Sequence, residues 1–348
     1  MANTVVDITG LSRDCKVYQK DLRMLPYAVL LDVLAAHGIN LFPGVQNKDV
    51  ITYLERQGGI ARPYKVGLNI RKANIGKMVE SELKVETAYA SIVDNIQNYK
   101  EKIIITPTDL VGSNVTKTHP FQVTMMMTII RTFAEDLLYA IFSGKRDTDD
   151  LSPFGCFNGF DTILDAAIVA GEVSNAKGNM IDSGSLAAPA AGQTTALDNL
   201  IAWLRQADQN LLKSARLLMP KPIYNNLIDC LENKYQYKDA DIKALSAYIS
   251  NKNAGELEIV PSTIMGTGDR IMLVNTGLGE SILDFGMNSM GDADYVQLQP
   301  TAGGDDPNNF YYWIQGDYGT RIRSFHKKAI MINEGTNVAN SLSGDYRS

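Results

Sequence analysis

A long amphipathic segment dominates the pattern of hydrophobic and polar positions along this chain. It begins at Pro120, a residue favoured at the first position of a helix, and ends at Gly144. No glycine or proline interrupts it, and we expect Gly144 to end it in a left-handed conformation. The spacing predicts a helix over 120–143, about 35 Å long at 1.5 Å per residue. Apolar side chains recur along it at steps of three and four residues, namely Met126, Ile129, Ile130, Phe133, Leu137, Leu138, Ile141 and Phe142.

Charged side chains occupy the other side of this predicted helix. Arg131, Glu135 and Asp136 are grouped away from the apolar stripe, and charges in the middle of the segment argue against a membrane span. The stripe therefore needs a cover within the protein, and we expect strands that return near 295–333 to supply it.

Before this helix the pattern changes to a period of two residues, which is typical of strands. Residues 64–71 alternate in this way, and residues 79–89 do so again after a short polar turn. The two runs predict a long β-hairpin within about 60–106. A helix over Ala88–Tyr99 is an alternative, since apolar residues there also fit the helical period. Lys102–Thr106 predicts a further strand.

The first 60 residues predict a polar lead followed by two short helices. Tyr27–His37 is apolar nearly all round and is followed by Gly38, a helix stop signal. Asn47 is a candidate cap for a second helix over Lys48–Gln57. The first helix must pack on a larger surface, either this chain's own core or a neighbouring subunit.

The second half of the chain alternates between helical and strand patterns. Residues 154–161 predict a loop that folds back onto the end of the long helix, and the Gly/Ala/Ser-rich residues 171–195 predict a loop or linker. Thr195 and Asp198 form a capping-box arrangement for a helix that runs to Ser214. The remaining pattern predicts a compact α/β domain with strands at 216–219, 257–260 and 270–275 and helices at 222–234 and 240–249, then strands at 295–298, 309–315 and 320–333.

Composition and charge narrow the class of protein. The chain has 348 residues, with 33 Lys and Arg against 39 Asp and Glu, which gives a net charge of −6. This balance argues against a dedicated nucleic-acid binder, which would need an excess of basic residues. Its three cysteines are odd in number and widely spaced, which favours reduced thiols in a cytoplasmic setting over a disulfide framework or a zinc site. No apolar run approaches the roughly 18 residues of a membrane span.

Candidate chemistry is sparse. The three histidines are scattered, and the sequence contains no zinc-protease, nucleophile-elbow or phosphate-loop motif. Asp147, Asp149 and Asp150 resemble part of a calcium loop, but the glycine and the final acid that such a loop needs are missing. We therefore predict no catalytic, cofactor-binding or metal-binding residue.

One charge pattern suggests a contact between subunits. The start of the predicted hairpin carries five basic residues and no acidic residue before Glu80. A solvated strand face is one interpretation, and a basic arm laid across an acidic neighbour is the other, because complementary charge selects partners. The candidate inter-subunit contacts are Arg62, Lys65, Arg71, Lys72 and Lys77.

Several local strings, together with the order of elements, carry a resemblance to a known family. They are THP at 118–120, AEDLL at 134–138, FNGFDTI at 157–163, LLMPKPIY at 217–224 and GDYGTRI at 316–322. From Arg62 to Asn333 the chain resembles tailed-phage (Caudoviricetes) major capsid proteins, which have the Hong Kong ninety-seven type fold. It is most similar to those of Bacteroidales-type phages and prophages.

The resemblance implies an α+β fold with a spine helix, an extended β-hairpin loop, and peripheral and axial domains. It implies an N-terminal arm over 1–60, the extended loop over 60–106, a peripheral domain over 107–170 and 285–333, an axial domain over 171–284 and a polar tail over 334–348.

The implied function is structural. Subunits would assemble with copies of themselves into hexamers and pentamers of an icosahedral shell that packages double-stranded DNA. Scaffolding and portal proteins are further implied partners, and no cofactor, enzyme activity or membrane is implied. The implied location is the virion capsid, and the bacterial host cytoplasm during assembly. The alternatives are an encapsulin-like compartment shell and an enzyme of unrecognised class.

Overall fold

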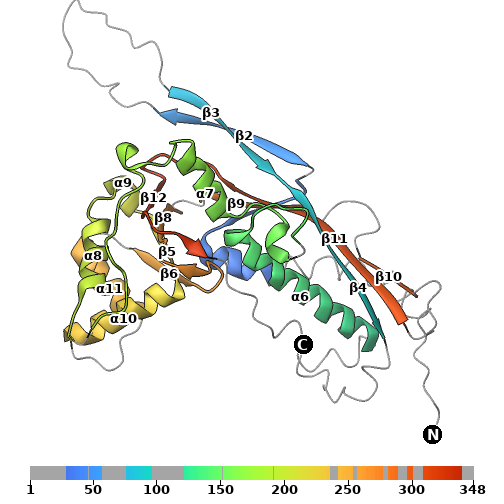
Figure 1. The fold of residues 1–348 in the computed structure, drawn as a ribbon. Coiled ribbons are helices and arrows are strands. Elements are labelled where there is room, and N and C mark those ends of the chain that lie inside the picture. The colour runs from blue at the N-terminus through green and yellow to red at the C-terminus, as the bar shows by residue number, and fades with distance from the viewer. Residues whose placement is uncertain are drawn as a thin grey trace, which may run out of the picture.

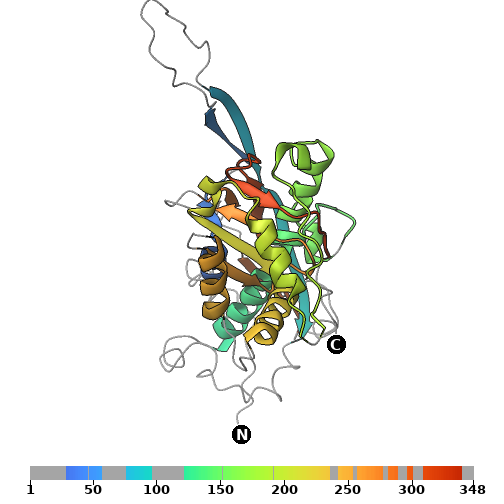
Figure 2. The same ribbon diagram turned by 90° about the vertical axis from the view of Figure 1, so that its left-hand side faces the viewer.

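The computed structural model describes residues 29–45, 47–56, 76–95, 121–150, 152–190, 192–235, 242–253, 257–276, 281–288, 296–300 and 309–338. These residues form a body with a long helix and two sheets, from which a two-stranded ribbon projects (Figure 1). The ribbon also extends well beyond the body in the perpendicular view (Figure 2).

The predicted long helix is confirmed as α6 (Phe121–Ser143). Its apolar stripe is buried as expected, with Ile130 and Ile141 fully inaccessible to solvent and Leu137 nearly so. The prediction that Gly144 ends the helix in a left-handed conformation is wrong, because Gly144 is absent from the glycines with positive φ. A glycine is needed there for space, since an added Cβ would lie 2.5 Å from the carbonyl oxygens of Ala140 and Phe157.

A five-stranded sheet covers α6. Strand β11 runs unbroken through its centre and pairs antiparallel with β4 along one edge. Its other edge carries β10 and then β9, because residues 310–314 pair with both β4 and β10, and residues 317–318 with both β4 and β9. Strand β1 adds to β9 in parallel. The strands are β1 (Asn40–Pro43), β4 (Glu86–Asn95), β9 (Leu283–Asn288), β10 (Val296–Pro300) and β11 (Asn309–Ile322).

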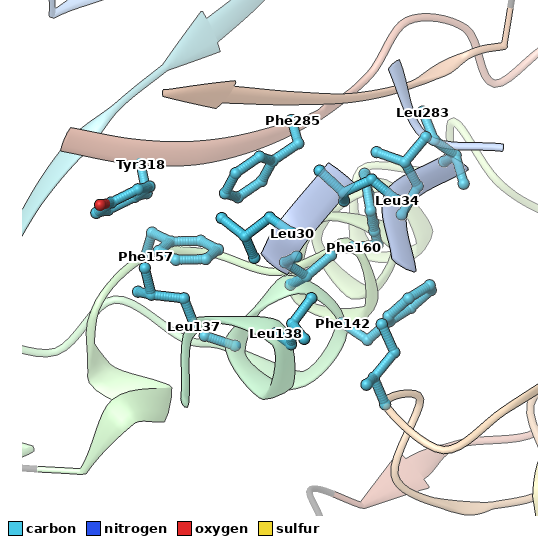
Figure 3. Close-up of a cluster of buried hydrophobic side chains, with 14 of the residues drawn as sticks. Leu30, Leu34, Leu137, Leu138, Phe142, Phe157, Phe160, Leu283, Phe285 and Tyr318 are labelled. Atoms are coloured by element: carbon cyan, nitrogen blue, oxygen red, sulfur yellow. The ribbon is translucent and has the colours of Figure 1, made fainter. Parts of the chain in front are cut away.

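The main hydrophobic core lies between this sheet and α6. Tyr318 and Phe285 point from the strands toward Leu137 and Phe157, and the helix formed by residues 29–37 inserts Leu30 and Leu34 into the same core (Figure 3). The rings of Phe133 and Tyr318 meet edge to face, with centroids 6.1 Å apart. The predicted cover of the spine by strands near 295–333 is therefore confirmed for β11.

The projecting ribbon consists of β2 (Lys48–Arg56) and β3 (Gly76–Lys84), paired antiparallel from Lys48 opposite Lys84 to Arg56 opposite Gly76. The predicted helix over 48–57 is therefore wrong. The run VITY at 50–53 is β-branched and aromatic, which suits a strand once a partner strand is present. Asn47 adopts a left-handed φ of 63° in a bend just before β2, so it does not cap a helix.

The hairpin prediction holds only in part. A strand over 79–89 is confirmed, split into β3 and β4 around Val85, and the helical alternative for 88–95 is excluded. The partner that the structure gives β3 is β2, whereas the predicted strands at 64–71 and 102–106 lie outside the described residues.

A second, smaller sheet and its helices form the α/β part of the chain. Its strand order is β12-β8-β5-β6, with β5 and β6 parallel and the other pairs antiparallel. One of its faces shares a second hydrophobic core with α8, α10 and α11, which includes the fully buried Trp203. The elements are α8 (Thr195–Leu204), β5 (Ala215–Pro220), α10 (Lys221–Tyr235), α11 (Ile242–Asn253), β6 (Glu258–Ser262), β8 (Met272–Asn275) and β12 (Ile330–Ile332).

Three further predictions in this half need correction. The helix expected from Thr195 to Ser214 breaks after Leu204, because the Asp208 side chain accepts a hydrogen bond from the backbone N–H of Asn210 and caps the short α9 (Gln209–Leu212). The cap of α8 is Thr194, one residue earlier than predicted. The strand expected over 320–333 is the end of β11 and the separate β12.

One helix, α7 (Phe160–Val169), has no counterpart among the predicted elements. It follows the loop that was predicted to fold back onto the end of the spine. The hydrogen bond from the backbone N–H of Gly159 to the carbonyl of Gly144 confirms this position of the loop. The remaining short elements are η1 (Pro153–Gly155), η2 (Asn175–Lys177), and β7 (Thr267–Gly268), which pairs with β13 (Asn337–Val338). Apart from η2 and an isolated bridge from Met180 to Ile332, residues 171–190 and 192–193 are irregular as predicted, although Val173 and Leu186 enter the two cores.

Candidate functional site: the base of the projecting hairpin

Chemical sites of the usual kinds are absent from the described part of the chain. No group of three or more His, Cys, Asp or Glu side chains could hold a metal ion there. None of the helices described is both long and apolar enough to cross a lipid bilayer. The most highly organised polar region lies where the ribbon β2–β3 joins the five-stranded sheet. We call this region the hairpin base, meaning residues 81–87 and the side chains of β1, β9, β11 and Arg323 that contact them or each other there.

A fully buried carboxylate forms the centre of the hairpin base. Asp284 on β9 is inaccessible to solvent and accepts hydrogen bonds from the guanidinium groups of two arginines. Arg321 Nε and Nη2 lie 2.9 and 2.5 Å from Asp284 Oδ2, and Arg323 Nε lies 3.0 and 2.8 Å from the two carboxylate oxygens. Asn40 Nδ2 donates to Oδ1 at 3.2 Å.

The same network of side chains also contacts the hairpin itself. Arg321 is 2% exposed, and its Nη1 donates to the backbone carbonyl of Ser81 on β3 at 3.2 Å. The Arg321 and Arg323 guanidinium groups also lie 5.8 and 5.4 Å from the centre of the Phe42 ring on β1. Because a buried charge is costly unless it is paired, this geometry fixes β1, β3, β9 and β11 relative to one another.

A small apolar cluster and two glycines bring the hairpin close to the sheet. Val45, Leu83 and Val85 are buried together with Phe42 packed against them. A Cβ on Gly286 would lie 2.9 Å from the Leu83 side chain. A Cβ on Gly319 would overlap the backbone carbonyl of Lys84. The strands therefore approach more closely here than residues with side chains would allow.

Exposed polar contacts complete the junction. Glu86 pairs with Lys84 and with Arg146, whose Nε lies 3.6 Å from Glu86 Oε2. Thr87 Oγ1 donates to Asp317 Oδ1 at 2.7 Å. Surface pairs of this kind contribute little stability, whereas breaking the buried Asp284 network would leave a buried charge without a partner.

Beyond its base the ribbon carries exposed apolar side chains. Met78 and Val50 are 73% and 45% exposed, and they share one face of the ribbon because Val50 pairs with Glu82 and Met78 with Leu54. At the far end of the five-stranded sheet, Tyr89 and Val93 on β4 are 60% and 62% exposed. The Tyr89 ring stacks on that of Trp313, with centroids 5.4 Å apart.

Most of the predicted contact residues lie outside this description. Arg62, Lys65, Arg71 and Lys72 are not among the described residues. Lys77 lies on β3, where its backbone is opposite that of Glu55 on β2.

Sequence reasoning missed the Asp284 network. A usable signal was present for one member, since Asp284 interrupts an otherwise apolar strand pattern in ILDFGM.

A second buried ion pair joins α7 to Arg270, which lies between β7 and β8. Arg270 Nη1 lies 3.2 Å from Asp161 Oδ1, and its Nη2 lies 2.6 Å from Asp165 Oδ1. Arg270 Nε also donates to the Gly335 carbonyl at 2.9 Å. Burial raises the pKa of Asp161 to about 6, although the Arg270 charge and hydrogen bond and a hydrogen bond from Asn337 act in the opposite direction.

Two surface hollows lie among the described residues. A shallow groove of about 890 Å³ lies beside α11, lined by Lys213, Arg216, Lys243 and several hydroxyl side chains. Ser246 donates within the chain, to Leu257, and Arg216 is paired with Glu258. A hollow of about 250 Å³ lies at the hairpin base itself, next to Glu82, Glu86 and Arg321.

Comparison with known proteins identifies this architecture. No family model and no curated protein sequence matches the chain. Solved structures do match, among them a chain of the satellite phage P4 procapsid including size determination (Sid) protein, at 14% identity and a TM-score of 0.51, covering 90% of this chain and 91% of that one. A chain of the capsid of the empty GTA particle matches at 11% identity and a TM-score of 0.53, covering 88% and 90%. The native GTA particle matches at 10% identity and a TM-score of 0.51, with the same coverage. The mixed α+β chain therefore has the Hong Kong ninety-seven type capsid-protein fold.

Proposed function

We propose that this chain is a major capsid protein, which assembles with copies of itself into a closed icosahedral shell of the kind that tailed phages build. The observation that carries the proposal is the projecting ribbon β2–β3 on a body that shares the fold of capsid chains over nearly its whole length. The role is structural, and its place is the capsid of a virion.

The ribbon is suited to contact a neighbouring subunit. A two-stranded ribbon is marginally stable alone in water, and this one carries exposed Met78 and Val50 away from the body. The hairpin base holds it through the buried Asp284, Arg321 and Arg323 network, so its direction is fixed before assembly. An arm that projects from one end of the body favours head-to-tail contacts, which form closed rings when the rotation between successive subunits closes.

The basic residues of the hairpin region supply a further part of the proposal. We infer that Arg62, Lys65, Arg71, Lys72 and Lys77 contact an acidic surface of the next subunit, because complementary charges set register and partner choice. Support for this comes from the sequence, where no acidic residue interrupts the five, and from the position of Lys77 on the projecting β3.

A charge-reversal variant tests the assembly function. Arg71→Glu, Lys72→Glu and Lys77→Glu together should leave the subunit folded by circular dichroism but reduce the yield of fast-sedimenting particles at least about tenfold. The matched control reverses Lys213 and Lys243, which lie beside the groove of the α/β part. Particle yields that are equal in wild type and triple variant would contradict the basic-arm contact.

Several finer points belong to the same proposal. Its organisation is an N-terminal arm over 1–60, an extended loop over 60–106, a peripheral domain over 107–170 and 285–333, an axial domain over 171–284 and a polar tail over 334–348.

The proposed capsomers are hexamers and pentamers, the proposed cargo is double-stranded DNA, and scaffolding and portal proteins are the further proposed partners. The Bacteroidales-type origin rests on the local sequence strings alone, and the genes adjacent to this one would test it. No described residue favours the encapsulin-like alternative.

A further inference from the structure

His37 lies buried where the end of helix 29–37 meets the end of β6. His37 is 7% exposed. Each of its two ring nitrogens has a hydrogen-bond partner. Nδ1 lies 2.7 Å from the carbonyl oxygen of Val33, and Nε2 lies 2.8 Å from Ser262 Oγ. Because a carbonyl oxygen can accept but not donate, Nδ1 carries a proton.

The hydrogen bonds of Ser262 determine the state of the other nitrogen. Ser262 Oγ accepts from the backbone N–H groups of Ile264 and Met265, each at 3.2 Å. A hydroxyl has two lone pairs and one proton, so with both lone pairs used its proton is directed to His37 Nε2. Nε2 must then be unprotonated, and the arrangement is complete only with a neutral imidazole.

The surroundings do not stabilise a charged ring. The charged side chain that acts on the ring is Arg216 on β5, and it pairs with Glu258 on β6 at 2.6 Å. Arg216 also donates to the Ala35 carbonyl at 2.7 Å, and the Phe142 ring of α6 lies 5.9 Å from the imidazole. Burial lowers the pKa of His37 from 6.5, the bond to Val33 raises it by less, and the charge of Arg216 lowers it further.

We propose that His37 is an acid-sensitive latch, which joins helix 29–37 to the turn 262–265 and opens when the imidazole gains its second proton. A protonated Nε2 can no longer accept from Ser262 and becomes a donor, so Ser262 must give one of its two lone pairs to the ring and lose one of its bonds from the Ile264 and Met265 amides, while its own proton loses its acceptor. Since the folded chain favours the neutral ring, the latch adds stability above pH 6.5 and loses it as the pH falls below that value. This device is independent of whether the chain forms shells.

Hydrogen exchange on the unassembled full-length chain tests the latch. Protection of the Ile264 and Met265 amides, corrected for intrinsic exchange rates, should fall roughly tenfold in wild type between about pH 7.5 and about pH 5. The variant His37→Gln keeps a neutral acceptor for the Ser262 hydroxyl and should show no such fall. The control His326→Gln should behave as wild type. No loss of protection in wild type, or an equal loss in His37→Gln, would overturn the proposal.

A direct titration covers the case in which His37→Gln does not fold. The ring proton signals of His37 in wild type should titrate in NMR with a midpoint below 6.5, the ordinary value. A midpoint at or above that value would rule the latch out.

Discussion

At the scale of single residues, the buried charges define this structure. Asp284 is fully inaccessible and is held by two arginines, and Asp161 is almost fully buried beside Arg270. Each pair joins segments that are far apart in the sequence. Removing one partner of such a pair leaves a charge without compensation, which costs far more than the pair contributes.

Asp284→Asn tests the first network. The variant keeps the size of the side chain but leaves Arg321 buried without a counter-ion, so the free energy of unfolding should fall by about 3–5 kcal/mol. Urea unfolding of the unassembled subunit measures this. Glu258→Gln, which removes an exposed partner of Arg216, should cost less than about 1 kcal/mol. Similar losses from both variants would show that Asp284 is not the anchor of the hairpin base.

Asp161 makes stability depend on pH. Its pKa is raised to about 6 in the folded chain from 3.8, so folding takes up a proton between these values and stability falls as the pH rises from 4 to 6. The contribution is about 3 kcal/mol at its full extent. Wild type should therefore lose stability relative to Asp161→Asn over this interval in urea unfolding. A difference between the two proteins that stays constant from pH 4 to 6 would mean that Asp161 titrates normally.

At the scale of elements, the local pattern of residues predicted the long helix better than it predicted which strands pair. The spine α6 was predictable because both its apolar stripe and its end signals come from residues within one continuous segment of the sequence. The segment β2 was predicted as a helix, since a nine-residue run becomes a strand only when a distant partner, here β3, pairs with it. For the same reason the sequence identified one arm of the hairpin, 79–84, and assigned it a different partner.

Gly319 on β11 lies against Lys84 at the end of β3. The variant Gly319→Ala tests this close approach of the two strands. The added Cβ would collide with the Lys84 carbonyl, which would push β3 away from β11 and destabilise the subunit by about 1–3 kcal/mol. The matched control is Gly192→Ala, where nothing lies within 4 Å of the added Cβ and the cost comes only from a φ of 77°. Thermal unfolding measures both. A smaller effect at Gly319 than at Gly192 would contradict the packing account.

At the scale of the whole molecule, the order of elements was more informative than any motif. The spine, the strand region before it and the α/β part after it led to the Hong Kong ninety-seven type fold, which the comparisons confirm. The candidate site was less predictable. The five basic residues that stand out in the sequence are not part of the hairpin base, and the roles of Asp284, Arg321 and Gly319 there depend on contacts between strands that no local pattern specifies.

The proposed capsid function depends on what the ribbon β2–β3 contacts. A reconstruction of the purified, assembled protein by electron cryo-microscopy would test it most directly. We expect a closed shell of many identical subunits in which each ribbon lies on a neighbouring subunit, with Val50 and Met78 buried there. A protein that stays monomeric under all assembly conditions, or a particle whose ribbons touch no neighbour, would contradict it.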